Sequence, residues 1–133
     1  MRRIAIAGIP RSGKSTLAAD LSTIWTLPVR HTDDLIATHD WSAASEMVAR
    51  WFDEPTGWII EGVTVSRALR KWRRYHPDQR PPVDIVYFLA HPTVMELSRE
   101  QSALALGVQT IHGEILDWLR EHRVEGYVAG HVL

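Results

Sequence analysis

Near the start of the chain stands the stretch RIAIAGIPRSGKST, which spans residues 3–16. Its first part, residues 3–7, is mostly apolar and predicts a buried strand. Apolar side chains then recur at helical spacing over residues 15–25, which predicts a helix. A strand and a helix joined by a short glycine-containing loop favour an α/β protein with an anion site at the helix N-terminus.

The loop between these elements follows the pattern G-x-x-x-x-G-K-[ST]. Glycines allow successive backbone N–H groups to point into one concavity, and the helix N-terminus adds positive potential there. We expect Lys14 to reach the β- and γ-phosphates of a nucleotide and the Ser15 hydroxyl to ligate Mg²⁺. The residues expected to bind the nucleotide are Gly8, Ile9, Pro10, Arg11, Ser12, Gly13, Lys14, Ser15 and Thr16.

The rest of the chain alternates strand and helix signals. Strands are predicted over residues 28–32, 57–62 and 84–90, with a helix capped by Asp40 or Ser42 after the first and a helix capped by Thr64 after the second. Two helices are predicted after the last strand, the first of them opened by Thr93 with Glu96 and closed by Gly107. This order predicts a parallel sheet with helices on both faces and a ligand at the carboxyl ends of the strands.

Composition limits the function classes. With 133 residues, of which 45% are hydrophobic and 23% charged, the chain is expected to form a single domain over residues 1–133. Its net charge of −1 gives no general attraction to nucleic acids or acidic membranes. It has no cysteine, which excludes disulfides and thiolate chemistry and suits a cytoplasmic protein. The apolar run near the start is too short to span a membrane, so no membrane partner is expected.

Four segments carry a family resemblance: GIPRSGKST at residues 8–16, HTDD at 31–34, WIIEG at 58–62 and VDIVYFL at 83–89. In this order they resemble P-loop kinases of the nucleoside monophosphate and small-molecule kinase group, over residues 1 to 90. The resemblance implies a three-layer P-loop NTPase fold with strand order 2-3-1-4, an ATP donor with Mg²⁺, and an acceptor between the second and third strand ends. The chain departs from the family after the fourth strand, where the fifth strand is absent or short and Arg99 is the one lid-like arginine.

Acidic residues follow two of the predicted strands. The resemblance implies that Asp33 or Asp34 holds the acceptor hydroxyl, and a carboxylate there could orient or deprotonate it. Asp33 is our candidate for catalysis, whereas Asp34 is as readily explained as a cap of the following segment. Glu61 is either a contact to the magnesium shell or the acceptor, or a surface residue of a turn.

A basic segment with aromatic residues, SRALRKWRRYHPDQR, covers residues 66–80. Guanidinium groups suit phosphate because they offer a planar fork of donors, so Arg67 and Arg70 are expected to bind acceptor phosphates, and Arg67 to assist transfer. The alternative is a solvated helix face with Trp72 in the core. Trp41 lies outside the apolar pattern and is expected to face the acceptor. His31 adjoins the acidic pair and either contacts the substrate or, as we expect, is an ordinary strand residue.

The acceptor is the least constrained part of the prediction. A guanine-nucleotide switch is excluded because its base-reading element Asn-Lys-x-Asp needs an asparagine, and the chain has none. HTDD, WIIEGV and RALRKW in this order resemble small kinases of bacteriophage genomes, including those that phosphorylate 5-hydroxymethyluracil within DNA. We therefore expect transfer to hydroxymethylated pyrimidine in phage DNA. A kinase of a free nucleotide or small metabolite and a non-catalytic ATP-binding regulatory module remain alternatives, and the oligomeric state is open.

Overall fold

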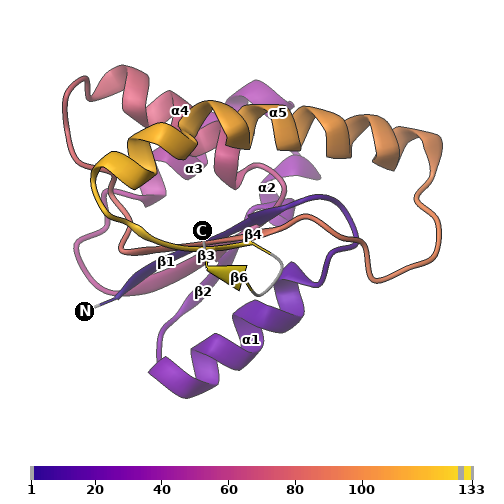
Figure 1. The fold of residues 1–133 in the computed structure, drawn as a ribbon, viewed down its shortest axis with the longest axis horizontal. Helices are drawn as coiled ribbons and strands as arrows, with labels where there is room; N and C mark the ends of the chain where they lie inside the picture. Colours follow the sequence, from indigo (N-terminus) through magenta and orange to yellow (C-terminus); the bar gives the residue numbers. More distant parts are fainter. Residues whose placement is uncertain (1, 129–130, 133) are drawn as a thin grey trace.

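The computed structural model describes residues 2–128 and 131–132, and an open α/β sheet runs through them (Figure 1). The elements in chain order are β1 (Arg3–Gly8), α1 (Lys14–Trp25), β2 (Val29–His31), α2 (Asp33–Ile36), α3 (Trp41–Trp51), β3 (Trp58–Glu61), α4 (Val65–Tyr75), β4 (Ile85–Leu89), α5 (Arg99–Glu121), β5 (Glu125–Val128) and β6 (His131–Val132). None of the helices in these described residues is long and apolar enough to cross a membrane.

The sheet has the strand order β2-β3-β1-β4-β5-β6. Strands β1 to β5 run parallel, and β6 is antiparallel to β5. Helices α3, α4 and α5 lie on one face, and α1 lies on the other (Figure 1). The predicted α/β class is confirmed, and the carboxyl ends of the parallel strands meet at one edge of the sheet, where ligands bind in such folds.

The core alternates along the central strand β1. Ala5 and Ala7 face the cluster that includes side chains of α3, α4 and α5, whereas Ile4 and Ile6 face the cluster formed with α1. This period of two is what a strand covered on both faces requires. Trp72 of α4 belongs to the first cluster, so its predicted place in the core is confirmed.

The strand order differs from the predicted 2-3-1-4 because two strands continue the sheet beyond β4. Ile85 of β4 pairs with Glu125 of β5, and Tyr127 of β5 pairs with Val132 of β6. The segment Glu-Gly-Tyr-Val of β5 is short and contains a glycine, so its own strand propensity is weak. Pairing with β4, about forty residues away in sequence, makes it a strand.

The predicted helix boundaries after β4 are wrong. The residues from Thr93 to Glu96 are not helical, and α5 begins at Arg99, where Ser98 and Gln101 form a reciprocal capping box. Gly107 does not close a helix but lies inside α5. A glycine inside a helix costs only about 1 kcal/mol, and the buried side chains on both sides of it offset this cost. Thr64 precedes α4 as predicted, but its side chain makes no capping hydrogen bond.

A buried histidine joins α5 to the rest of the fold. The ring of His112 is 2% exposed and stacks on Phe88 with 4.1 Å between ring centroids, and its Nδ1 lies 2.7 Å from the Ser66 hydroxyl. Burial lowers the pKa of His112 to about 4 from its ordinary value of 6.5. Between pH 6.5 and pH 4, His112 therefore stays neutral in the folded protein, whereas the same side chain binds a proton in the unfolded chain.

We expect this histidine to make the free energy of unfolding fall by about 3 kcal/mol between pH 7.5 and pH 4, beyond what carboxylates contribute. The measurement is urea unfolding of the wild type and of His112→Gln across this range. Since glutamine does not titrate, the stability difference between the two proteins should shift by that amount in favour of the variant. If the unfolding free energies of the two proteins changed equally with pH, the lowered pKa of His112 would be refuted.

Candidate functional site

A cavity of about 270 Å³ lies at the carboxyl ends of β1 and β3. Three segments far apart in the sequence supply most of its walls: the loop before α1, the start of α2 and the end of β3. Of the residues predicted to form the site, Lys14, Ser15, Asp33 and Glu61 are thus brought together. The lining residues are Arg11, Ser12, Gly13, Lys14, Ser15, Thr16, Asp33, Glu61 and Thr93.

The loop before α1 has a defined backbone. Gly13 adopts φ of +90°, a conformation that residues with a side chain rarely adopt, and it leads directly into α1. Thr93 fixes the loop from the segment after β4, because its N–H and its hydroxyl both donate to the Arg11 carbonyl, at 2.7 and 3.0 Å. The first-turn amides of α1 have no acceptors within the helix, and the first-turn residues Lys14, Ser15 and Thr16 line the cavity. The loop therefore offers several N–H donors to one anion.

Lys14 is the buried cation of this cavity, which the exposed Arg11 also lines. Its side chain is buried, with 7% of the residue exposed, and its ammonium donates to the Ile9 carbonyl at 2.6 Å and to the Ser12 hydroxyl at 3.3 Å. Burial lowers the pKa of Lys14, and the carboxylates of Glu61 and Asp33 raise it. The ammonium is thus folded back over its own loop, where an anionic ligand can take over its hydrogen bonds.

Glu61 is a buried carboxylate, 1% exposed, at the end of β3. Its Oε1 accepts from the Ser15 hydroxyl at 3.3 Å and lies 2.6 Å from Nδ1 of His31. The alternative that Glu61 is a surface turn residue is therefore wrong. His31, for which the sequence favoured a plain strand role over a contact with substrate, lies beside the site because it ends β2 and the parallel register pairs it with Glu61. The sequence signal for this contact is that two strands expected to be adjacent and parallel both end in polar residues.

The oxygens of Ser15 and Glu61 form a donor set that fits Mg²⁺, a hard cation that takes oxygen ligands. Within residues 2–128 and 131–132, no group of three or more histidine, aspartate or glutamate side chains could hold a metal ion. Mg²⁺ usually keeps several waters and is bound through one or two protein oxygens together with substrate phosphates. Ser15 and Glu61 together supply the one or two protein oxygens that such a Mg²⁺ site needs.

The two neighbouring aspartates differ in position. Asp33, the first residue of α2, lines the cavity and lies close enough to Lys14 to raise its pKa. Asp34 is the next residue of this short helix; both aspartates are exposed, but Asp34 is not among the residues that line the cavity. The geometry therefore favours Asp33 as the carboxylate that acts on a ligand.

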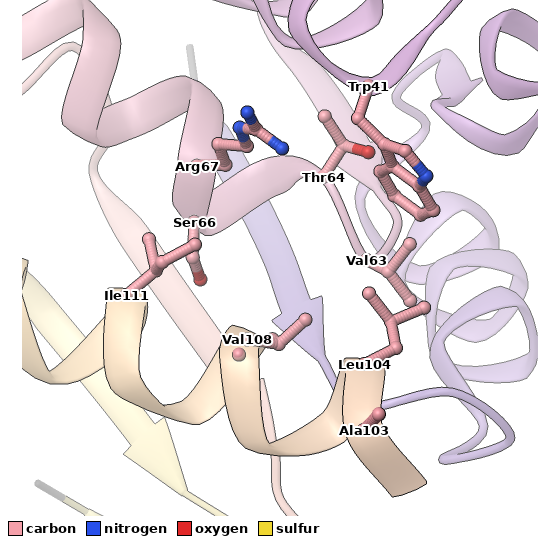
Figure 2. A pocket seen from close by; sticks show the side chains of 10 residues that line it. Trp41, Val63, Thr64, Ser66, Arg67, Ala103, Leu104, Val108 and Ile111 are labelled. Carbon is pink, nitrogen blue, oxygen red and sulfur yellow. The ribbon is translucent and has the colours of Figure 1, made fainter. Parts of the chain in front are cut away.

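A second cavity, of about 250 Å³, lies between α3, the start of α4 and α5 (Figure 2). Trp41 and Arg67, both predicted to contact an acceptor, line it. Arg70 does not: its guanidinium donates to the Glu114 carboxylate of α5 at 3.0 Å. The other lining residues are Val63, Thr64, Ser66, Ala103, Leu104, Gly107, Val108 and Ile111.

No family model and no curated protein matches this sequence. Among solved structures, the chain is similar to an uncharacterized protein from Eubacterium ventriosum, with a TM-score of 0.57 and 14% sequence identity. The match covers 96% of this chain and 86% of the other. At this identity the likeness concerns the arrangement of helices and strands, and it shows that this α/β fold occurs in another protein.

Proposed function

We propose that this protein is a P-loop kinase that transfers the γ-phosphoryl group of ATP to a hydroxyl group with the help of Mg²⁺. The observation that carries the proposal is the placement of Lys14, Ser15, Asp33 and Glu61 around one cavity at the helix N-terminus. Phosphoryl transfer needs mainly positioning and stabilisation of negative charge, and this cavity offers both. The favoured acceptor is 5-hydroxymethyluracil in DNA, which rests on the sequence resemblance.

Each residue has a role in this reaction. The loop amides and the Lys14 ammonium bind the phosphates and stabilise the charge that develops on them. Mg²⁺, when bound by Ser15 with Glu61 beside it, would neutralise further phosphate charge. Because His31 and Ser15 both contact Glu61, they keep its carboxylate in the cavity. Arg67, in the neighbouring cavity, is the cation placed to bind the acceptor's phosphate.

The bonds exchanged in the step are few. The acceptor oxygen forms a bond to the γ-phosphorus, and the bond from this phosphorus to the oxygen shared with the β-phosphate breaks, so that ADP leaves. Asp33 accepts the proton of the hydroxyl group as the new bond forms. Asp33 lines the same cavity as Lys14 and Ser15, which is where the phosphates would lie.

Replacing Asp33 by asparagine is expected to lower the transfer rate by about 10²- to 10³-fold, because the amide cannot accept the proton. Asp34→Asn, the same change one residue later, is expected to cost less than about tenfold, since Asp34 does not line the cavity. The measurement is the single-turnover rate with labelled ATP, Mg²⁺ and a hydroxymethylated single strand. Equal losses in the two variants would contradict the assignment of Asp33.

A further inference from the structure

The cavity between α3, α4 and α5 (Figure 2) shares no lining residue with the cavity at the loop before α1. We infer that it holds the heteroaromatic ring of the acceptor, a single nucleotide unit that carries the hydroxyl group to be phosphorylated. This inference rests on the proposed function and adds a second binding site to it. Four observations support the inference: the walls of the cavity, its polar groups without hydrogen-bond partners, its size and its position.

The walls suit a flat ring. Figure 2 shows the indole of Trp41 on one side of the cavity, with Leu104 and Val108 of α5 below and beside it. An aromatic face stacks on any planar ring, and aliphatic side chains pack against its edges without offering a partner to a charge. The cavity therefore favours a planar ring, and Arg67 is the charged residue in its lining.

Two polar groups at this cavity have no hydrogen-bond partner among the described residues. The hydroxyl of Thr64, a residue that is 1% exposed, is one, and Nε of Arg67 is the other. Buried polar atoms in folded proteins are nearly always satisfied, so an unsatisfied pair beside a cavity calls for a ligand. The edge of a base carries both donors and acceptors and can satisfy the hydroxyl, while the guanidinium can also reach the nucleotide's phosphate.

Size and position also fit one nucleotide unit. A volume of about 250 Å³ lies just below the range of cavities that take drug-sized ligands, so it holds one ring system and not a stack of bases. Glu61 ends β3 next to the phosphate loop, and Val63, two residues later, lines this second cavity. Two residues span at most about 7.6 Å between their Cα atoms. A hydroxyl group on the ring can therefore face the phosphate site.

The nucleotide unit can be free or part of a strand. If it belongs to a strand, its base must leave the stack of its neighbours to enter the cavity, which costs less in single-stranded than in duplex DNA. The shared chemistry is a pyrimidine nucleotide with a hydroxymethyl group, and the two sources can be compared by direct binding without ATP.

Two glycines of α5 provide a matched pair of variants. Gly107 lines the cavity, and a Cβ added to it would meet no atom within 4 Å, so Gly107→Leu can fill the cavity without displacing the fold. Gly113 also has open space around an added Cβ and is exposed like Gly107, but it is not among the lining residues. Gly113→Leu brings the same gain in helix propensity. Only the first variant should affect a ligand in the cavity.

The experiment titrates the wild type and both variants with 5-hydroxymethyl-2′-deoxyuridine monophosphate, by calorimetry, and with a single-stranded oligonucleotide containing one 5-hydroxymethyluracil, by fluorescence anisotropy. We expect Gly107→Leu to weaken binding of at least one ligand by about tenfold or more, and Gly113→Leu to change it less than about twofold. ATP should bind equally to all three proteins. The ligand that binds more tightly to the wild type identifies the source.

Equal affinities of the two variants, or no binding of either ligand to the wild type, would overturn the inference. These outcomes differ from a failure of the proposed function, since binding is measured without phosphoryl transfer. A wild type that binds the ring in this cavity and transfers no phosphate refutes the kinase proposal and supports the ring site.

Discussion

Replacing Lys14 by alanine is expected to lower the rate of phosphoryl transfer by about 10³-fold while the protein stays folded. The ammonium donates to the Ile9 carbonyl within the loop between β1 and α1, and Lys14 lines the same cavity as Asp33 and Glu61. Without it, the loop keeps the exposed Arg11 but loses the buried positive charge at the place where negative charge develops. Alanine also suits the first turn of a helix, so α1 should form as before.

The chain offers a matched control, because its only other lysine is Lys71. The Lys71 ammonium donates to the carbonyl and the hydroxyl of Ser42, at 2.9 and 3.1 Å, and so links α4 to α3 away from the phosphate loop. Lys71→Ala should change the transfer rate less than about threefold. Single-turnover rates and thermal unfolding of both variants provide the comparison. A Lys14→Ala protein that transfers phosphate at the wild-type rate would overturn the phosphate assignment.

The largest expected loss of stability comes from Gly62→Ala, at least about 3 kcal/mol. Gly62 follows Glu61 and has φ of +148°, which residues with a side chain rarely adopt. An added Cβ would lie 1.7 Å from the Thr32 hydroxyl oxygen and 2.8 Å from the Thr32 Cβ. Thr32 is fully buried, and its amide donates to the Glu61 carbonyl, so it cannot move aside without disturbing the sheet.

Urea unfolding of Gly62→Ala, with Gly107→Ala as the control, measures this loss. At Gly107 the same change meets open space inside a helix and is expected to be neutral or to stabilise the protein by up to about 1 kcal/mol. The double variant Thr32→Gly, Gly62→Ala removes the clash and should be less unstable than the sum of the two single changes. A Gly62→Ala protein as stable as the wild type would show that β2 and β3 do not end as described.

The part of the fold nearest the phosphate loop was readily predicted from local sequence. The predicted strand at residues 3–7 and helix at residues 15–25 differ from β1 (Arg3–Gly8) and α1 (Lys14–Trp25) by one residue each. Apolar alternation, helical spacing and the loop glycines all act over a few residues here and agree with one another. The candidate residues Lys14, Ser15 and Asp33 follow from the same local signals.

Features that depend on distant residues were not predictable in this way. The strand β5 exists because β4 pairs with it, and Glu61 is buried because β2 and α1 bring His31 and Ser15 to it. The start of α5 was predicted wrongly from Thr93 with Glu96, since Ser98 and Gln101 form the capping box in the structure. Thr93 instead binds the Arg11 carbonyl, a contact across 82 positions that local pattern does not contain.

The most direct test of the kinase proposal is transfer of labelled γ-phosphate from ATP, with Mg²⁺, to a panel of acceptors. The panel holds single-stranded DNA with 5-hydroxymethyluracil, the same strand with thymine, free nucleoside monophosphates and no acceptor, each with the wild type and Lys14→Ala. The account predicts label on the hydroxymethylated strand with the wild type and none with Lys14→Ala. Label on a nucleoside monophosphate alone would show that the acceptor is a free nucleotide and not hydroxymethylated DNA. A wild type that binds ATP and labels no acceptor would contradict the account and favour a regulatory module.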